Sequence, residues 1–101
     1  MAKHILKVAP KSAKVVFEND MIRVIELTMK KGEKVPMHSH KRGFSYSLND
    51  GRIRSIHKNG KSSVINVKRG DFGWSEIDGL ETHAVENLSG ILRELCIEFK
   101  S

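Results

Sequence analysis

Short apolar segments alternate with turn-forming residues along most of this chain. The segments are rich in Val, Ile, Phe and Leu, and they are separated by sequences such as Asn19-Asp20, Asn49-Asp50-Gly51, Asn59-Gly60 and Arg69-Gly70-Asp71. Asparagine, aspartate and glycine favour turns because they tolerate a left-handed backbone or hydrogen-bond their own main chain. No segment combines a helical apolar period with helix caps. Evenly spaced short strands of this kind predict an all-β domain, either a sandwich or a barrel.

The pattern predicts strands over nearly the whole chain. They cover residues 14–18, 21–29, 35–40, 43–48, 52–58, 62–67, 71–75, 82–86 and 91–99. Residues 2–8 are expected to form either a short helix or an extended arm. Asp50-Gly51 and Asn59-Gly60 predict two-residue hairpins with type I′ turns, which need positive φ at both central residues.

The length of 101 residues fits one domain, residues 1–101, in which residues 1–12 form an N-terminal arm or an edge strand. The single cysteine, Cys96, excludes an intrachain disulfide, and its apolar neighbours predict a packed strand thiol. No apolar run approaches the roughly 20 residues of a membrane span. We therefore expect a soluble, cytoplasmic protein that does not interact with membranes.

The chain carries a formal net charge of +6, which attracts anions. Its basic residues are scattered in pairs such as Lys30-Lys31 and Lys41-Arg42, and no basic helix with interleaved aromatic residues is present. We therefore expect a solvated basic surface or a small anionic ligand, and we do not expect nucleic acid as a partner.

Three histidines carry the candidate chemistry. His38 and His40 are two residues apart in a predicted strand, so their side chains point to the same side of a sheet. A third histidine, His83, lies on a later predicted strand. Three imidazoles that leave positions open for water or substrate can hold a transition metal. The sequence thus predicts a divalent metal on these three residues, and it leaves Fe, Mn, Ni, Zn and Cu open.

The residues around these histidines resemble the two motifs of small single-domain cupins, the cupin type-2, conserved-barrel family. The first motif comprises Gly32, His38, His40 and Gly51, and the second comprises Gly70, His83 and Asn87. The resemblance covers residues from about 17 to 99. It implies a cupin-type jelly-roll β-barrel with the three histidines as metal ligands. It also implies a homodimer, often with an edge or N-terminal strand exchanged, and a small barrel does have edges to cover.

Two positions depart from the cupin pattern. The usual proline of the second motif is Ile77 in this chain, and the more important departure lies in the first motif. Where the first motif has a glutamate ligand, this chain has Phe44, or Ser45 with the alternative spacing. A site of three neutral histidines leaves a bound metal ion more of its positive charge, which favours an anionic substrate or a deprotonated water. By resemblance, cupins with three histidines include dioxygenases that cleave diketones or oxidise thiols.

Two functions stay open at this point. One is a metal-dependent enzyme, such as a dioxygenase, that acts on a small anionic or enolisable substrate. The other is a non-catalytic cupin module that binds a metal or a small ligand. The sequence identifies no catalytic residue, because no clear acid or base stands beside the histidines.

Four further residues are candidates for the pocket. If Asp50-Gly51 closes a hairpin, the strand of Phe44 and Tyr46 pairs with the strand of His57, and alternation puts these side chains on one face. His57 is then a base, a fourth ligand or a support for a ligand, unless it is a surface residue. Tyr46 and Trp74 are expected to line the cavity or to fill the core, with the core favoured for Tyr46.

Overall fold

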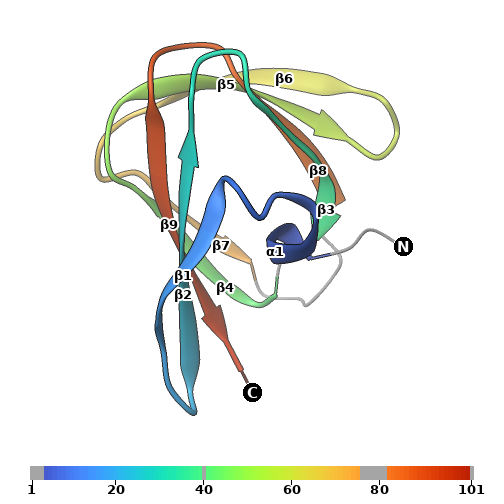
Figure 1. Cartoon of the computed structure of the whole chain (residues 1–101). Coiled ribbons are helices and arrows are strands. Elements are labelled where there is room, and N and C mark those ends of the chain that lie inside the picture. The colour runs from blue at the N-terminus through green and yellow to red at the C-terminus, as the bar shows by residue number, and fades with distance from the viewer. Residues whose placement is uncertain (1–3, 40, 76–81, 101) are drawn as a thin grey trace.

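A computed structural model describes residues 4–39, 41–75 and 82–100 of the chain. Within these residues, strands form two antiparallel sheets that face each other (Figure 1). The first sheet has the order β1-β2-β9-β4-β7, made of Ala13–Glu18, Ile22–Met29, Leu92–Phe99, Gly43–Ser47 and Phe72–Ser75. The second sheet has the order β3-β8-β5-β6, made of Lys34–Ser39, Thr82–Asn87, Gly51–His57 and Ser62–Val67. The predicted all-β fold is confirmed, and every predicted strand is present with ends that agree to within one residue.

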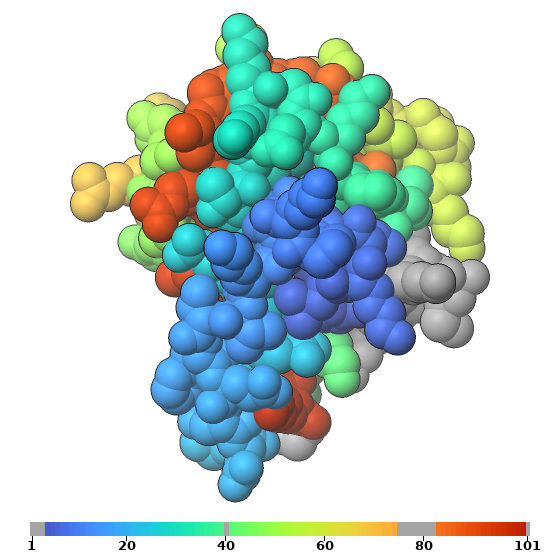
Figure 2. All heavy atoms as spheres, in the orientation of Figure 1, coloured from blue at the N-terminus to red at the C-terminus, as the bar shows by residue number. Residues whose placement is uncertain are grey.

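The N-terminal segment forms the short helix that was one of its two expected forms. Helix α1, Ile5–Val8, begins after His4, whose ring Nδ1 accepts a hydrogen bond from the backbone N–H of Leu6. Ile5 is fully buried, and the helix lies beside β3 between the two sheets (Figures 1 and 2). Among the described residues, no helix is long and apolar enough to cross a membrane.

The prediction of a hairpin at Asp50-Gly51 is wrong. Strand β4 belongs to the first sheet and β5 to the second, so the two strands do not pair. Neither residue has the positive φ that a type I′ turn requires, and the chain instead passes from one sheet to the other. The predicted pairing of the strand of Phe44 and Tyr46 with that of His57 is therefore wrong as well.

The hairpin at Asn59-Gly60 is confirmed, but its turn differs from the predicted type. It joins β5 to β6, and the backbone N–H of Gly60 donates to the carbonyl of His57 at 2.9 Å. Only Gly60 has a positive φ, of 86°, and Asn59 does not. This is the signature of a type I turn followed by a left-handed glycine, which is the usual solution when the loop is longer than two residues.

The hydrophobic core is aliphatic and fills only part of the space between the sheets. Its residues are Ile5, Ala9, Ala13, Ile25, Leu27, Met29, Val35, Val85, Leu92 and Cys96. The inner positions of β4 are small, namely Gly43, Ser45 and Ser47, while Phe44 and Tyr46 alternate with them toward the outside. Small inner residues leave room in the interior, and this room becomes the pocket described below.

Candidate functional site

The structure brings two of the three predicted ligands together. His38 on β3 and His83 on β8 are directly opposite each other in the antiparallel register. Their ring centroids lie 4.7 Å apart at an interplanar angle of 52°. Residues opposite each other in a sheet share one face, so both imidazoles point to the same side of the second sheet. The third predicted ligand, His40, lies outside the described residues.

Hydrogen bonds orient both rings. The Nδ1 of His38 lies 2.8 Å from the carbonyl oxygen of Pro36, and since a carbonyl only accepts, Nδ1 carries the proton. The Nε2 of the neutral ring then carries the lone pair. The Nδ1 of His83 lies 3.3 Å from the hydroxyl of the buried Ser55. Metal-binding histidines are commonly fixed in this way through the nitrogen that does not bind the metal.

Burial keeps both imidazoles neutral at neutral pH. Desolvation lowers the pKa of His38, the hydrogen bond to the Pro36 carbonyl partly opposes this, and the nearby His4 lowers it further. Desolvation also lowers the pKa of His83 to about 4, with smaller contributions from His38 and His57. A neutral imidazole is the form that binds a metal, so neither ring has to lose a proton at neutral pH before it can bind one.

His57 lies on the same face of the second sheet as His38 and His83, but because of a strand pairing that the sequence did not predict. It stands opposite His83 in the pairing of β5 with β8, whereas the prediction placed it opposite β4. His38, His83 and His57 thus form a row across β3, β8 and β5, in which His57 is the exposed member. Within the part of the chain that the structure describes, no group of three His, Cys, Asp or Glu residues is placed to hold a metal ion.

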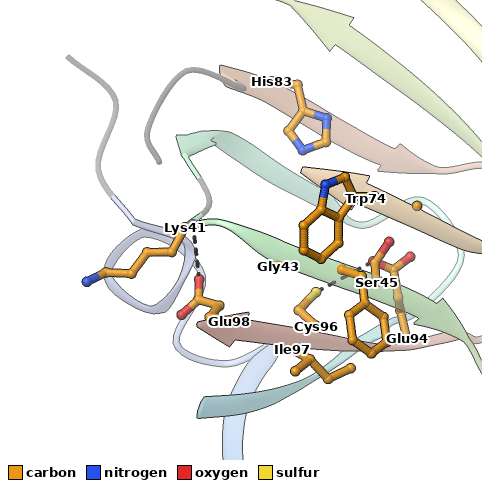
Figure 3. Close-up of a pocket in the computed structure, with 11 residues that line it drawn as sticks. Lys41, Gly43, Ser45, Trp74, His83, Glu94, Cys96, Ile97 and Glu98 are labelled. Atoms are coloured by element: carbon orange, nitrogen blue, oxygen red, sulfur yellow. Dashed lines mark hydrogen bonds between the residues drawn. The ribbon is translucent and has the colours of Figure 1, made fainter. Parts of the chain in front are cut away.

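A pocket of about 240 Å³ lies beside His83 (Figure 3). Its lining comes from β4, β7, β8 and β9 and includes Phe44, Ser45, Trp74, His83, Glu94, Cys96 and Glu98, with Lys41 before β4. Two of the predicted pocket residues, Phe44 and Trp74, are therefore in this lining. Tyr46 is not, and it is not in the core either, since its side chain is 41% exposed on the outer face of the first sheet.

The register of β4 decides which residue takes the place of the cupin glutamate. Ser45 stands opposite the buried Cys96 of β9, so its side chain faces the interior. Phe44 stands opposite Ile97 and Trp74 and alternates with Ser45, so these three side chains line the pocket from the other side of the strands. The inner position at this point of β4 is thus a small hydroxyl, Ser45.

One inward carboxylate, Glu98, is held by the fold. Its Oε1 accepts from the Arg23 guanidinium at 3.0 and 3.2 Å, and its Oε2 lies 2.5 Å from Nε2 of His4. The backbone N–H of Lys41 donates to the same carboxylate at 3.4 Å. Burial alone would raise the pKa of Glu98, but the hydrogen bonds with His4 and Arg23 lower it to about 2. Glu98 therefore ties α1, β2 and the start of β4 to β9.

A second inward carboxyl, Glu94, is the residue that sequence reasoning missed. Burial raises its pKa, and the Cys96 thiol donates to its Oε1 at 3.6 Å. Burial also raises the pKa of the Cys96 thiol well above its usual range, so the predicted buried strand thiol is confirmed. The alternation of Glu94, Cys96 and Glu98 along one strand was a usable signal, because an apolar run with acidic residues two apart turns them all to one face.

The two lowered histidine pKa values predict a loss of stability in acid. Between pH 6.5 and about 4 the unfolded chain binds a proton at His83 that the native state does not, so stability falls as the pH falls. The shift corresponds to about 3 kcal/mol for His83. We expect the free energy of unfolding to differ less between pH 7 and pH 4.5 in His83→Gln than in the unmodified protein. Urea unfolding of the metal-free proteins at the two pH values measures this difference.

The exposed His57 supplies the control for this titration. His57→Gln should remove only the small contribution of His57 to the lowered pKa of His83, so it should change the pH dependence far less than His83→Gln does. Glu98 affects the stability in a lower pH range. Its lowered pKa stabilises the folded state above about pH 4.5, and this stabilisation is lost as the pH falls toward about 2. An equal loss of stability between pH 7 and 4.5 with and without His83 would contradict the assignment.

The fold is similar to that of solved cupin structures. A cupin domain from Bordetella pertussis is 19% identical with a TM-score of 0.75, over 88% of this chain and 92% of that chain. A cupin superfamily protein from Desulfitobacterium hafniense is 14% identical with a TM-score of 0.64, over 88% of this chain and 76% of that one. A cupin-2 domain protein from Shewanella frigidimarina is 13% identical with a TM-score of 0.61, over 99% of this chain and 85% of that chain. No protein-family model and no curated protein matches the sequence.

These similarities establish that the chain has the cupin fold. They bear out the resemblance that the glycine and histidine motifs predicted, and they assign the two facing sheets to the cupin jelly roll.

Proposed function

We propose that this protein is a small metal-binding cupin that holds one divalent transition metal on His38, His40 and His83. The observation that carries the proposal is the opposed pair of His38 and His83, two neutral imidazoles 4.7 Å apart on one inner face. Two oriented imidazoles suit Fe, Mn, Ni, Zn or Cu, and the third ligand in the proposal, His40, follows His38 by two residues in the sequence.

The pocket beside these histidines suits a small anionic or enolisable molecule. Lys41 lines it, and the charge of Glu98 is already compensated by Arg23. A divalent metal at the site would polarise a carbonyl or carboxylate oxygen, or lower the pKa of a bound water. This chemistry supports a metal-dependent enzyme such as a dioxygenase.

Metal content tests the proposal directly. The purified protein, supplemented with metal during expression, should carry close to one transition metal ion per chain by elemental analysis. His38→Ala and His83→Ala should each remove most of it, because two remaining imidazoles bind far more weakly than three. His57→Ala is the matched control and should keep the metal. A folded protein that stays metal-free after supplementation would refute the proposal.

A non-catalytic cupin module that binds a metal or a small ligand is the second candidate. The observation that favours it is Ser45, which puts a neutral hydroxyl where the first motif usually supplies a carboxylate. A screen of the Fe(II), Mn(II), Ni(II) and Zn(II) forms against diketones, thiols and sugar acids separates the two functions. Oxygen uptake or turnover supports the enzyme, and its absence with every metal supports the binding module.

The proposal extends to the oligomeric state of the protein and to its cellular compartment. We propose a homodimer, since the edge strands of a small open barrel are better covered than exposed. With a single cysteine the chain forms no intrachain disulfide, which suits the reducing cytoplasm that we propose for it.

A further inference from the structure

A second cavity lies at the seam between the edge strands of the two sheets. Strand β7 is the last strand of the first sheet and β6 the last of the second, and these two strands do not pair with each other. Residues of both strands line a cavity of about 480 Å³. We call it the seam cavity; its lining includes Ser45, Ser47, Ile65, Val67, Phe72 and Glu94.

The inner side of β6 is left uncovered at this seam. Ile65 stands opposite Ile53, which in turn stands opposite the fully buried Asn87, so Ile65 faces the interior. Its side chain is nevertheless 44% exposed. The first sheet contributes small residues to the same cavity, such as Ser47 and Gly73, and these do not fill the space. The cavity is therefore built by the choice of residues on the two inner faces.

Polar groups of the lining are open to a ligand. Ser47 is only 5% exposed, yet no hydrogen bond of the described residues uses its hydroxyl. Because no fully enclosed side-chain oxygen in the described part of the chain lacks a partner, this hydroxyl reaches the cavity. Glu94 accepts the Cys96 thiol on Oε1, which leaves its Oε2 open. Both groups can hydrogen-bond an uncharged polar group of a ligand.

The seam cavity adjoins the pocket beside His83. The two share three lining residues, Ser45, Gly73 and Glu94, and two of these, Ser45 and Glu94, are labelled in Figure 3. The pocket beside His83, at about 240 Å³, is smaller than the roughly 300–1,000 Å³ of most small-molecule sites, whereas the seam cavity falls within that range. A ligand bound at the histidines therefore has room to extend past Glu94.

The two ends of this combined space differ in charge. Lys41 lines the pocket beside His83, and the proposed metal adds positive charge there. Among the described residues, no lysine, arginine or histidine lines the seam cavity, which offers hydroxyls, apolar side chains and the carboxyl groups of Asp71 and Glu94. A carboxylate placed in the seam cavity would lose hydration without gaining a cation, which is costly.

We propose that the seam cavity binds the uncharged tail of a monocarboxylate whose carboxylate lies at the histidines. The inference rests on the proposed metal site and narrows its substrate class. The substrate is an acid with a single carboxylate and a tail of several carbons that is apolar or carries hydroxyl groups. A dicarboxylate of the same length is selected against, and Ser47 and Glu94 are the groups that hydrogen-bond a hydroxyl on the tail.

Three carboxylates test this assignment on the Zn(II) form of the protein. Acetate reaches only the histidines, 6-hydroxyhexanoate adds an uncharged tail, and adipate carries a second carboxylate at the same length. In isothermal titration calorimetry, 6-hydroxyhexanoate should bind about 10–100-fold more tightly than acetate, because its tail buries apolar surface. Adipate should bind about 10-fold more weakly than 6-hydroxyhexanoate, because its second carboxylate finds no cation.

Substitutions at Ile65 locate the tail. Ile65→Trp fills the seam cavity and should lower the affinity for 6-hydroxyhexanoate to that for acetate, while acetate binds as before. Ile65→Lys adds a cation and should reverse the preference in favour of adipate. Val64→Trp and Val64→Lys are the matched controls, because Val64 is the preceding residue of β6, is 55% exposed and faces the other side of the sheet. Neither control should change the order of the three affinities.

The seam cavity is also testable without a metal. The probe is 1-pentanol, which is the tail of 6-hydroxyhexanoate without its carboxylate. It should shift the NMR signals of Ile65, Val67 and Gly73 in the metal-free protein. The shifts of Val67 and Gly73 should be lost in Ile65→Trp and kept in Val64→Trp.

The possible failures are distinguishable. Equal affinities for acetate and 6-hydroxyhexanoate in the Zn(II) form, or equal behaviour of Ile65→Trp and Val64→Trp, would overturn this inference and leave the metal site standing. A protein that takes up no metal but shows the 1-pentanol shifts would refute the metal site and support the seam cavity as the tail site. Absence of those shifts would overturn the inference whatever the metal content.

Discussion

Gly43→Ala is expected to prevent stable folding of the chain. A Cβ atom at this position would lie 1.8 Å from the carbonyl oxygen of Ile97 and 2.9 Å from its carbonyl carbon. Both atoms belong to the backbone of β9, so no side-chain rotation relieves the contact. The strand β4 would have to move away from β9 in the middle of the first sheet.

The cost of that movement is large because several contacts depend on it. Gly43 stands opposite Glu98, the carboxylate that also holds His4, Arg23 and the backbone of Lys41. We expect a loss of more than about 4 kcal/mol, against a total stability of about 5–15 kcal/mol for a domain of this kind. Urea unfolding followed by circular dichroism, together with the yield of soluble protein, measures it.

Two other glycines calibrate the result. Gly90→Ala meets no atom within 4 Å and should change the stability by no more than about 0.5 kcal/mol. Gly51→Ala would place its Cβ 2.8 Å from Cδ1 of Leu92, the end of a flexible side chain, and should cost about 1–2 kcal/mol. If Gly43→Ala were as stable as Gly90→Ala, the close approach of β4 to β9 would be refuted.

The strands were predictable from the sequence because turn residues mark their ends. The sequence did not reveal which face of each strand is buried. In β4 the aromatic residues Phe44 and Tyr46 suggest an inner face, yet the inner positions are Gly43, Ser45 and Ser47. Alternation identifies the residues of a strand that share a face. It does not identify the buried face here, because the outer face of this strand is apolar and its inner face is partly polar.

The candidate site was predictable in part for a similar reason. His38 and His83 lie on strands that pair directly, and the glycine and histidine motifs indicated this. The place of His57 depended on which strand β5 pairs with, and local turn chemistry at Asp50-Gly51 predicted the wrong neighbour. Sheet pairing between distant segments is set by the packing of the whole barrel, which short-range signals do not encode.

Glu94→Gln is expected to slow strongly the turnover of any substrate that the metal screen identifies, while the metal stays bound. Glu94 lines the pocket together with His83, and none of the ion pairs of the described residues involves it. Burial raises its pKa, so it holds a proton at a higher pH than an ordinary carboxyl. A group of this kind is suited to donate or accept a proton, and its loss should slow turnover by about 10²–10⁴-fold.

The comparison with Glu98 explains why Glu94 is the better candidate for proton transfer. Both carboxyls point inward from β9, but Arg23 and His4 hold Glu98 in its ionised form, which suits a structural role. Glu86→Gln is the control, because Glu86 pairs with Arg54 away from the pocket and its loss should leave turnover unchanged. The acid limb of the pH–rate profile should disappear in Glu94→Gln but not in Glu86→Gln. Unchanged turnover in Glu94→Gln would make the carboxyl a structural group, and the proton transfer would then have to pass through the metal-bound water or His57.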